Sequence, residues 1–334
     1  MNWDFLIKNK DSLCVSTDTR NLPAGCVFFA LHGANFDGNK FALQALEQGA
    51  SLAVIDDPEV YLQAQRSSSP QGDLQGAADL PRLLLVEDTL LALQDLARAW
   101  RRELGLPIIG ITGTNGKTTT KELLATVLST KYNLHYTQGN LNNQIGVPLT
   151  LLQITRAHEM AIVEMGASHP GDIKELVDIA EPNYGLITNV GRAHLEGFGS
   201  FEGVQRTKQE LYDYLVAHNG IIFRNADNPY LAEMENQAKQ CYTTLHNTTQ
   251  LYTTGSMPSG THLVGEYNAE NVSAAICVGR HFGISCEQAL EAIRQYVPTN
   301  NRSQAMQTAC NQLIVDAYNA NPTSMQAAIN AFKG

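Results

Sequence analysis

The chain has 334 residues, 43% of them hydrophobic and 17% charged, and a formal net charge of −10 at pH 7. An acidic chain without a lysine- or arginine-rich run lacks the positive face that nucleic acids and anionic membranes require, which excludes both as main partners. The first residues, MNWDFLIKNKDSL, do not have the pattern of a secretory signal, and no apolar run is long enough to span a membrane, so we expect neither. Six scattered cysteines without a CxxC pair indicate free thiols, so we expect a soluble cytoplasmic protein of two or three domains.

The first region, residues 1–86, is predicted to be a small α/β domain. Apolar runs at residues 25–31, 51–57 and 82–88 predict strands, and residues 39–50 have helical periodicity that ends at Gly49. Residues 66–81, rich in Ser, Gly, Gln and Pro, predict a surface loop. An amphipathic helix over residues 89–105 then leads into the second region.

The second region, residues 87–298, alternates strands and helices. Strands are predicted within residues 106–112, 160–167 and 184–191, and helices over residues 118–131 and 172–180. This alternation is typical of a doubly wound, mostly parallel α/β sheet, in which functional residues follow the carboxyl ends of the strands.

The third region, residues 299–334, shows one predicted strand (311–322) and one helix (323–334). A strand and a helix cannot bury a core alone, so we expect the beginning of an α/β domain that is cut short. A chain cut there is expected to bind its ligands but to turn over weakly.

The stretch GITGTNGKTTTKEL, residues 110–123, is a glycine-rich loop between a predicted strand and a predicted helix. The strict Walker spacing is not met, because five residues rather than four separate Gly110 from Gly116. Even so, Gly113 and Gly116 let the backbone wrap a phosphate, Lys117 supplies charge and Thr118 can bind Mg²⁺. Nucleotide binding is favoured over a plain glycine turn with a solvated lysine.

Three further residues lie where such a sheet would present ligands. Glu164 ends an apolar strand and suits a magnesium site, although a capped strand end is a comparable interpretation. His194 follows another strand end, where a structural histidine is the commoner case. Lys208 lies on a helix and, on the sequence alone, is interpreted as a solvated lysine paired with neighbours such as Glu210.

Near the end of the chain, polar residues recur at element boundaries. Asn268 and Asn271 stand at a helix start, where capping is the ordinary role. Arg302 could hold a phosphate with two hydrogen bonds, and Asp316, at a strand end, could bind a ribose hydroxyl.

Taken together, these segments resemble the Mur ligase family of peptidoglycan synthesis. The resemblance rests on GITGTNGKTTTKEL, GNLNNQIGVPLTLL, EMGASHPGDIKEL, NVGRAHLEGFGS, NRSQ and DAYNANPTSM, in that order, and spans nearly the whole chain. GTNGKT is shared with the folylpolyglutamate synthases, whereas GNLNNQIGVPLTLL and DAYNANP are typical of the branch that adds D-alanyl-D-alanine. The segment STDTRNLPAGCVFFALHGANFDGNKF resembles the family's uridine-nucleotide site, with Asn39 where a histidine is usual and, later, Tyr267 where the family often has histidine.

The resemblance also implies roles for individual residues. The ATP site would comprise Gly113, Thr114, Asn115, Gly116, Lys117, Thr118, Thr119, Asn268, Asn271, Arg302 and Asp316. Two Mg²⁺ ions would be held by Thr118, Glu164, His194 and Lys208, the last as a carbamylated lysine. Lys117, Asn143, His194 and Lys208 would serve catalysis, with Asn143 facing the reacting carboxylate. Ser16, Thr17, Asp18 and Arg20 would hold the uridine diphosphate part of the substrate.

The implied activity is ATP-dependent amide ligation by a monomer. The family joins D-alanyl-D-alanine to a UDP-N-acetylmuramoyl-tripeptide through an acyl phosphate; whether the third residue of the tripeptide is lysine or diaminopimelate stays open. Two alternatives are another amide ligase of the superfamily, such as a folylpolyglutamate synthase, and a P-loop nucleotide-binding module without ligase chemistry. The first lacks a uridine site, and the second leaves Glu164, His194 and Lys208 unexplained.

Overall fold

The computed structural model describes residues 1–33, 35–67, 82–241, 248–302, 304–316 and 322–333. Their contacts group the chain into two compact units. Unit 1 comprises Met1–Gly105 and Pro148–Ala157, and unit 2 comprises Leu106–Val147 and His158–Gly334. The loop predicted over residues 66–81 lies outside the described residues except for its first two positions, and the three-domain division remains a prediction.

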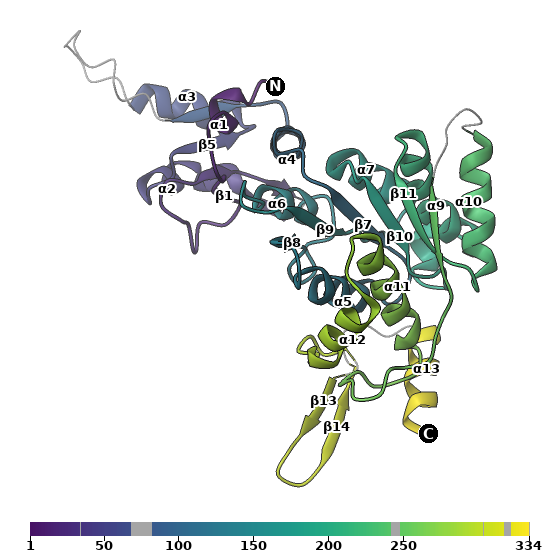
Figure 1. Cartoon of the computed structure of the whole chain (residues 1–334). Coiled ribbons are helices and arrows are strands. Elements are labelled where there is room, and N and C mark those ends of the chain that lie inside the picture. The colour runs from purple at the N-terminus through teal and green to yellow at the C-terminus, as the bar shows by residue number, and fades with distance from the viewer. Residues whose placement is uncertain (34, 68–81, 242–247, 303, 317–321, 334) are drawn as a thin grey trace. The chain divides into compact units, whose positions relative to one another are not determined.

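Unit 1 is built on a four-stranded parallel sheet with the order β1-β2-β5-β6, coloured purple to blue in Figure 1. Its central strands β2 and β5 are continuous apolar runs, as expected for strands covered on both faces. The predicted strands within residues 25–31, 51–57 and 82–88 are confirmed. The elements of unit 1 are α1 (Asp4–Ile7), β1 (Val15–Ser16), β2 (Val27–Phe29), β3 (His32–Gly33), β4 (Phe36–Asp37), the 3₁₀ helix η1 (Gly38–Phe41), α2 (Ala42–Glu47), β5 (Leu52–Ile55), α3 (Pro58–Ser67), β6 (Leu83–Leu85) and α4 (Thr89–Leu104).

The predicted helix over residues 39–50 begins as the tight turn η1 rather than as α-helix. The reason is local hydrogen bonding by Asn39, which is 5% exposed. Its amide donates to Asp56 Oδ1 at 2.8 Å and to Asp37 Oδ1 at 3.1 Å, while its carbonyl oxygen accepts from the Asp56 N–H. Asn39 therefore joins this turn to the end of β5.

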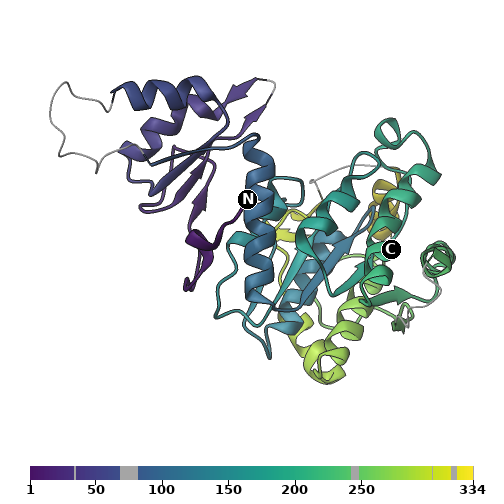
Figure 2. The same cartoon turned by 90° about the horizontal axis from the view of Figure 1, so that it is seen from above.

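Unit 2 contains a six-stranded sheet with the order β12-β11-β10-β7-β9-β8, in which every neighbouring pair is parallel. Helices α5 and α11 pack on one face, and α7 and α9 on the other, an arrangement that can be followed in Figures 1 and 2. The doubly wound sheet predicted from the sequence is confirmed. Its elements are β7 (Ile108–Thr112), α5 (Lys117–Leu128), β8 (Leu134–Tyr136), α6 (Gly146–Leu152, which continues into unit 1), β9 (Met160–Glu164), α7 (Asp172–Ala180), β10 (Tyr184–Ile187), α8 (Leu195–Phe198), α9 (Phe201–Ala217), β11 (Ile221–Asn225), α10 (Pro229–Cys241), β12 (Thr249–Tyr252), α11 (Asn268–His281) and α12 (Cys286–Gln295).

The chain after α12 forms a two-stranded antiparallel hairpin, β13 (Gln304–Gln307) with β14 (Gln312–Val315), followed by α13 (Pro322–Lys333). The sequence predicted β14 and α13 but not β13, whose four residues, QAMQ, contain no β-branched or aromatic side chain. Among the described helices, none combines the length and apolar character of a membrane span.

One hydrophobic core holds the two elements that flank the loop after β7, namely β7 and α5. Ile109 and Ile111 of β7 are fully buried and belong to the same cluster as Leu123 and Leu124 of α5 and Val278 of α11. Because the strand before the loop and the helix after it are both anchored, the loop itself is held between two fixed ends.

Candidate functional site

The glycine-rich loop turns sharply between β7 and α5, and two glycines make the turn possible. Gly113 has φ +147° and Gly116 has φ +80°, both in regions that other residues rarely adopt. A Cβ on Gly113 would lie 1.9 Å from Thr188 Oγ1, and one on Gly116 would lie 2.6 Å from Asn271 Oδ1. The positive φ angles and the close side chains of Thr188 and Asn271 therefore both require glycine at positions 113 and 116.

The loop is docked on the segment that follows β10. The Thr114 N–H donates to the Asn189 carbonyl at 3.0 Å, and the Asn115 N–H donates to Asn189 Oδ1 at 3.0 Å. Thr188 Oγ1 donates to the Asn115 carbonyl at 2.6 Å. Sequence reasoning missed Thr188 and Asn189; their only signal was their place at the polar end of residues 184–191, the stretch predicted to hold a strand, which in the structure ends at Ile187.

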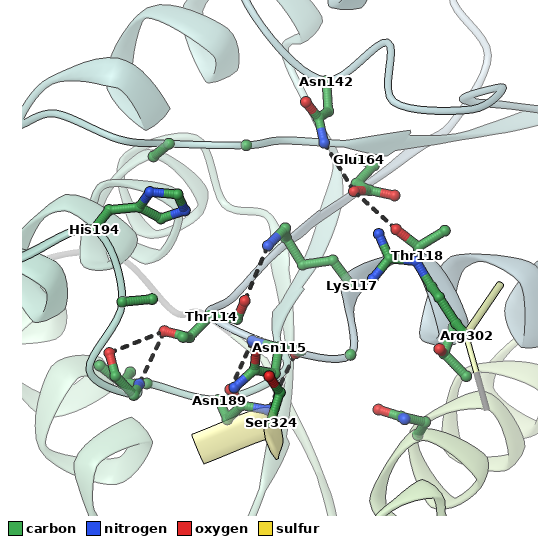
Figure 3. A pocket seen from close by; sticks show the side chains of 18 of the residues that line it. Thr114, Asn115, Lys117, Thr118, Asn142, Glu164, Asn189, His194, Arg302 and Ser324 are labelled. Atoms are coloured by element: carbon green, nitrogen blue, oxygen red, sulfur yellow. Dashed lines mark hydrogen bonds between the residues drawn. The ribbon is translucent and has the colours of Figure 1, made fainter. Parts of the chain in front are cut away.

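Lys117, the first residue of α5, folds back over the loop. Its Nζ donates to the Gly113 carbonyl at 2.8 Å and to the Thr114 carbonyl at 3.2 Å, and Figure 3 shows it in the centre of the site. Burial lowers the pKa of this ammonium, Glu164 raises it and Arg302 lowers it further. With α5 beginning at Lys117, the loop combines a cation and a helix N-terminus, which is a phosphate-binding arrangement.

Glu164, the last residue of β9, is 1% exposed. Its Oε1 accepts from Thr118 Oγ1 at 3.2 Å and from Asn142 Nδ2 at 2.9 Å (Figure 3), while Oε2 has no hydrogen-bond partner. A buried carboxylate with an unsatisfied oxygen next to a hydroxyl is a hard-oxygen donor set that suits Mg²⁺. The residues present therefore fit one magnesium ion.

The two neighbouring asparagines, Asn142 and Asn143, make different contacts. Asn142 contacts Glu164, as above, whereas Asn143 Oδ1 accepts from the Gly146 N–H at 2.9 Å and from the Ile145 N–H at 3.2 Å. Asn143 thus caps the start of α6, although it also lines the pocket. The resemblance implied a site role for Asn143 in NLNNQ and none for Asn142; the role of Asn143 stays a prediction.

Asn268 and Asn271 do not cap α11, whose N-cap is Tyr267. Instead, Asn271 Nδ2 donates to Asn268 Oδ1 at 3.0 Å, and Asn271 Oδ1 accepts from Thr120 Oγ1 at 3.0 Å. Both asparagines are nearly buried. They connect the start of α11 to the first turns of α5, directly beside Gly116.

These groups surround one pocket of about 900 Å³ within unit 2. Most of the predicted ATP and metal residues line it, together with residues that the sequence analysis did not name, among them Asn142, Ser168, His169, Asn189 and Glu270. The predicted residues that line it are Thr114, Asn115, Gly116, Lys117, Thr118, Thr119, Asn143, Glu164, His194, Asn268, Asn271, Arg302 and Asp316. Gly113 and Lys208 are not among the lining residues.

His194 lies apart from the Thr118–Glu164 pair (Figure 3). His194 is exposed and adopts φ +51° at the start of α8, and Figure 3 places it across Lys117 from Glu164. In the described part of the chain, no three His, Cys, Asp or Glu side chains form a metal-binding group.

The interpretation of Lys208 as a solvated lysine is wrong: it is 3% exposed, on α9, with Nζ 5.8 Å from the centre of the Phe198 ring. Burial, with a smaller contribution from Lys117, lowers the pKa of Lys208 to about 7. Glu210 does not pair with it but accepts from the N–H groups of Gly171 and Lys174. A buried lysine that is partly neutral at pH 7 is a nucleophile.

The four residues predicted for the uridine diphosphate lie together in unit 1, at and after β1. Ser16 Oγ donates to the Asp18 carbonyl at 3.0 Å, and Thr17 is half-buried between them. Arg20 holds Asp18 with two nitrogens, the shorter contact being 2.6 Å from Nη2 to Oδ2, and this lowers the pKa of Asp18 to about 2.

Two family models match the chain. The one described as the Mur ligase middle domain matches residues 111–279, and the one described as the Mur ligase family, catalytic domain, matches residues 14–101.

Curated relatives with high coverage share one printed name, UDP-N-acetylmuramoyl-tripeptide–D-alanyl-D-alanine ligase. The Bacillus subtilis protein is 39% identical over 330 residues, covering 94% of this chain and 69% of the relative. The Escherichia coli protein is 36% identical over 337 residues, covering 94% and 70%.

Solved structures agree. A crystal structure of MurF from Acinetobacter baumannii has a TM-score of 0.77 at 30% identity, covering 95% of this chain and 70% of that one. MurF ligase from Thermotoga maritima in complex with ADP has a TM-score of 0.79 at 26% identity, covering 97% and 75%.

Proposed function

This chain belongs to the Mur ligase family, and from that premise we propose that it is the ATP-dependent ligase that adds D-alanyl-D-alanine to a UDP-N-acetylmuramoyl-tripeptide. The observation that carries the proposal is the pocket in which the Lys117 loop and the buried Glu164–Thr118 pair meet, in a chain 39% identical to a ligase of that name.

The chemistry begins with a carboxylate, which is a poor acyl donor because its leaving group would be oxide. The terminal carboxylate of the tripeptide attacks the γ-phosphorus of ATP, ADP leaves, and an acyl phosphate forms. The free amine of D-alanyl-D-alanine then attacks the acyl carbon, phosphate leaves and the amine loses a proton to give the amide. Lys117 and the N–H groups at the start of α5 hold the transferring phosphate, where they stabilise developing negative charge.

Mg²⁺ would be held by Thr118 and Glu164, and it would supply positive charge between the two anionic reactants. Lys208 is proposed to react with CO₂: its neutral amine attacks the carbon, an N–C bond forms, one N–H proton is released to solvent, and a carbamate results. Support comes from its burial and its pKa of about 7. The carbamate would supply two oxygen ligands, and His194 with the carbamate would then hold a second Mg²⁺.

The remaining site residues complete the proposal. Asn268, Asn271, Arg302 and Asp316 would bind the nucleotide, and Ser16, Thr17, Asp18 and Arg20 would bind the uridine diphosphate, with Arg20 exchanging Asp18 for a phosphate. A monomeric state and a cytoplasmic location belong to the same proposal; sedimentation velocity checks the first.

Thermal unfolding with UDP-N-acetylmuramoyl-tripeptide, against the same tripeptide without the nucleotide, tests the function. A specific ligand at about 100 times its Kd adds roughly 2.7 kcal/mol of stability. We expect this shift only with the nucleotide-linked form. Comparing ligands whose tripeptide carries lysine or diaminopimelate at the third position identifies that residue.

Arg20→Ala should reduce the shift and leave stabilisation by ADP intact. The control Arg98→Ala removes a similar ion pair, with Asp95 on α4, and should change neither. Stabilisation by ADP alone would instead indicate a nucleotide-binding module.

A further inference from the structure

A second lysine of the loop helix, Lys121, is completely buried beneath the site. It lies on α5, one turn after Lys117, with 0% of its side chain exposed. Burying an ammonium costs several kcal/mol unless its surroundings compensate. The sequence analysis gave this residue no role, and the phosphate-binding loop does not use it.

Lys121 contacts Glu122 on its own helix and the residues at the ends of strands β8 and β9. Its Nζ donates to the Thr137 carbonyl at 2.6 Å and lies 3.1 Å from Glu122 Oε1. Thr137 in turn uses Oγ1 to accept the Glu164 N–H at 3.0 Å. Lys121 therefore reaches the backbone of Glu164 through a single intervening residue.

Lys121 also approaches the Glu164 side chain directly. Its Nζ lies 3.9 Å from Glu164 Oε2, the oxygen without a hydrogen bond, whereas Thr118 and Asn142 contact Oε1. The two carboxylate oxygens are thus distinguished by their surroundings: one faces a hydroxyl that can bind a metal, and the other faces a buried cation.

We infer that Lys121 is a positioning residue for the magnesium site: through Thr137 and through Oε2 it holds the Glu164 carboxylate so that Oε1 stays beside Thr118. The inference rests on the proposed ATP- and Mg²⁺-dependent function. Groups that orient a ligating side chain in this way commonly change metal affinity 10- to 100-fold when removed.

The sign of the effect separates this role from a simple electrostatic one. Removing a positive charge near a cation site would, by Coulomb's law alone, strengthen Mg²⁺ binding. Losing the orientation of Glu164 would weaken it. Lys121→Met keeps the length of the side chain and its apolar stem but removes the ammonium. It therefore gives tighter Mg²⁺ binding under the electrostatic explanation and weaker Mg²⁺ binding under the positioning explanation.

The test measures ADP binding by calorimetry at increasing Mg²⁺, which gives an apparent Kd for Mg²⁺ without any turnover. We expect Lys121→Met to raise that Kd by about 10- to 100-fold while leaving ADP affinity without Mg²⁺ within about twofold. Lys131→Met removes the same charge from an exposed lysine that contacts the Phe282 carbonyl, and it should leave both constants unchanged.

A second variant covers the case in which Lys121→Met fails to fold. Thr137→Val removes the hydroxyl that accepts the Glu164 N–H with little change in volume, and it should also weaken Mg²⁺ binding. Unchanged or tighter Mg²⁺ binding in the folded variants would overturn the inference. If the unaltered protein binds no ADP at all, the proposed function fails instead.

Discussion

Several positions of the glycine-rich loop accept only a small range of residues, and Gly113 is the most restricted of them. Its φ of +147° and the distance of 1.9 Å between a built Cβ and Thr188 Oγ1 combine backbone strain with a steric clash. Backbone strain of this kind costs about 1–3 kcal/mol, and overpacking costs a similar amount.

We therefore predict that Gly113→Ala lowers the free energy of unfolding by roughly 2–6 kcal/mol and abolishes stabilisation by ADP. Gly139→Ala is the matched control, because Gly139 also has a positive φ, +55°, but no atom within 4 Å of a built Cβ. It should cost only about 1–2 kcal/mol and keep ADP binding. Urea unfolding with and without ADP measures both; equal losses in the two variants would contradict the steric argument.

Lys208 makes a different prediction, because its chemistry depends on protonation. Only the neutral amine attacks CO₂, and burial lowers the pKa of Lys208 to about 7. Each carbamate formed also releases one proton, so at constant dissolved CO₂ the carbamate signal should be small at pH 6, rise steeply towards pH 7 and keep rising, less steeply, at pH 8. NMR with ¹³C-labelled CO₂ follows the carbamate signal.

The control for this experiment is the exposed Lys174, which pairs with Asp178 on α7. Lys174→Met should keep the carbamate signal, and Lys208→Arg should eliminate it. A signal that survives in Lys208→Arg would mean that another amine is modified.

At the scale of elements, α7 shows how neighbouring helices hold the site loops. Its N-cap, Gly171, has no side chain, and α9 supplies the missing acceptors instead. Glu210 Oε1 accepts from the Gly171 N–H at 3.0 Å, and Oε2 accepts from the Lys174 N–H at 2.7 Å. The loop before α7, with Ser168 and His169, lines the pocket, so this cap fixes one wall of the site.

Glu210→Ala should cost about 1–3 kcal/mol of unfolding free energy, because two N–H groups lose their acceptors. Glu210→Gln, which keeps one carbonyl oxygen, should cost less. The exposed Glu233 on α10 provides the control, since Glu233→Ala should stay within about 0.5 kcal/mol. Chemical denaturation measures all three; a Glu210→Ala variant as stable as the control would show that solvent replaces the cap.

Across the whole molecule, the sequence predicted features that depend on local patterns. β7, the glycines and Lys117 lie in one short stretch, and Glu164 ends an obvious apolar strand. The sequence could not predict features that depend on packing between segments far apart in the chain. The burial of Lys121 and Lys208, the docking of the loop on Asn189 and the contact of Asn142 with Glu164 all require the folded sheet.

The chain segments that make up unit 1 also could not be predicted from the sequence. Pro148–Ala157 belongs to unit 1 although residues of unit 2 flank it on both sides. The Trp100 indole donates to the Ile154 carbonyl at 2.8 Å, and Arg156 contacts Glu103 at 2.5 Å. No composition shift marks a segment that joins its unit through a buried indole and an ion pair.

The folded-back position of Lys117 has a consequence for turnover. Its ammonium donates hydrogen bonds to two carbonyls of its own loop. Hydrogen bonds to a charged group are worth about 1.5–3 kcal/mol each, so a phosphate gains only the difference when it captures the lysine. The loop thus competes with its own ligand. The same competition favours release of ADP, because the ammonium can return to the two loop carbonyls when the diphosphate leaves.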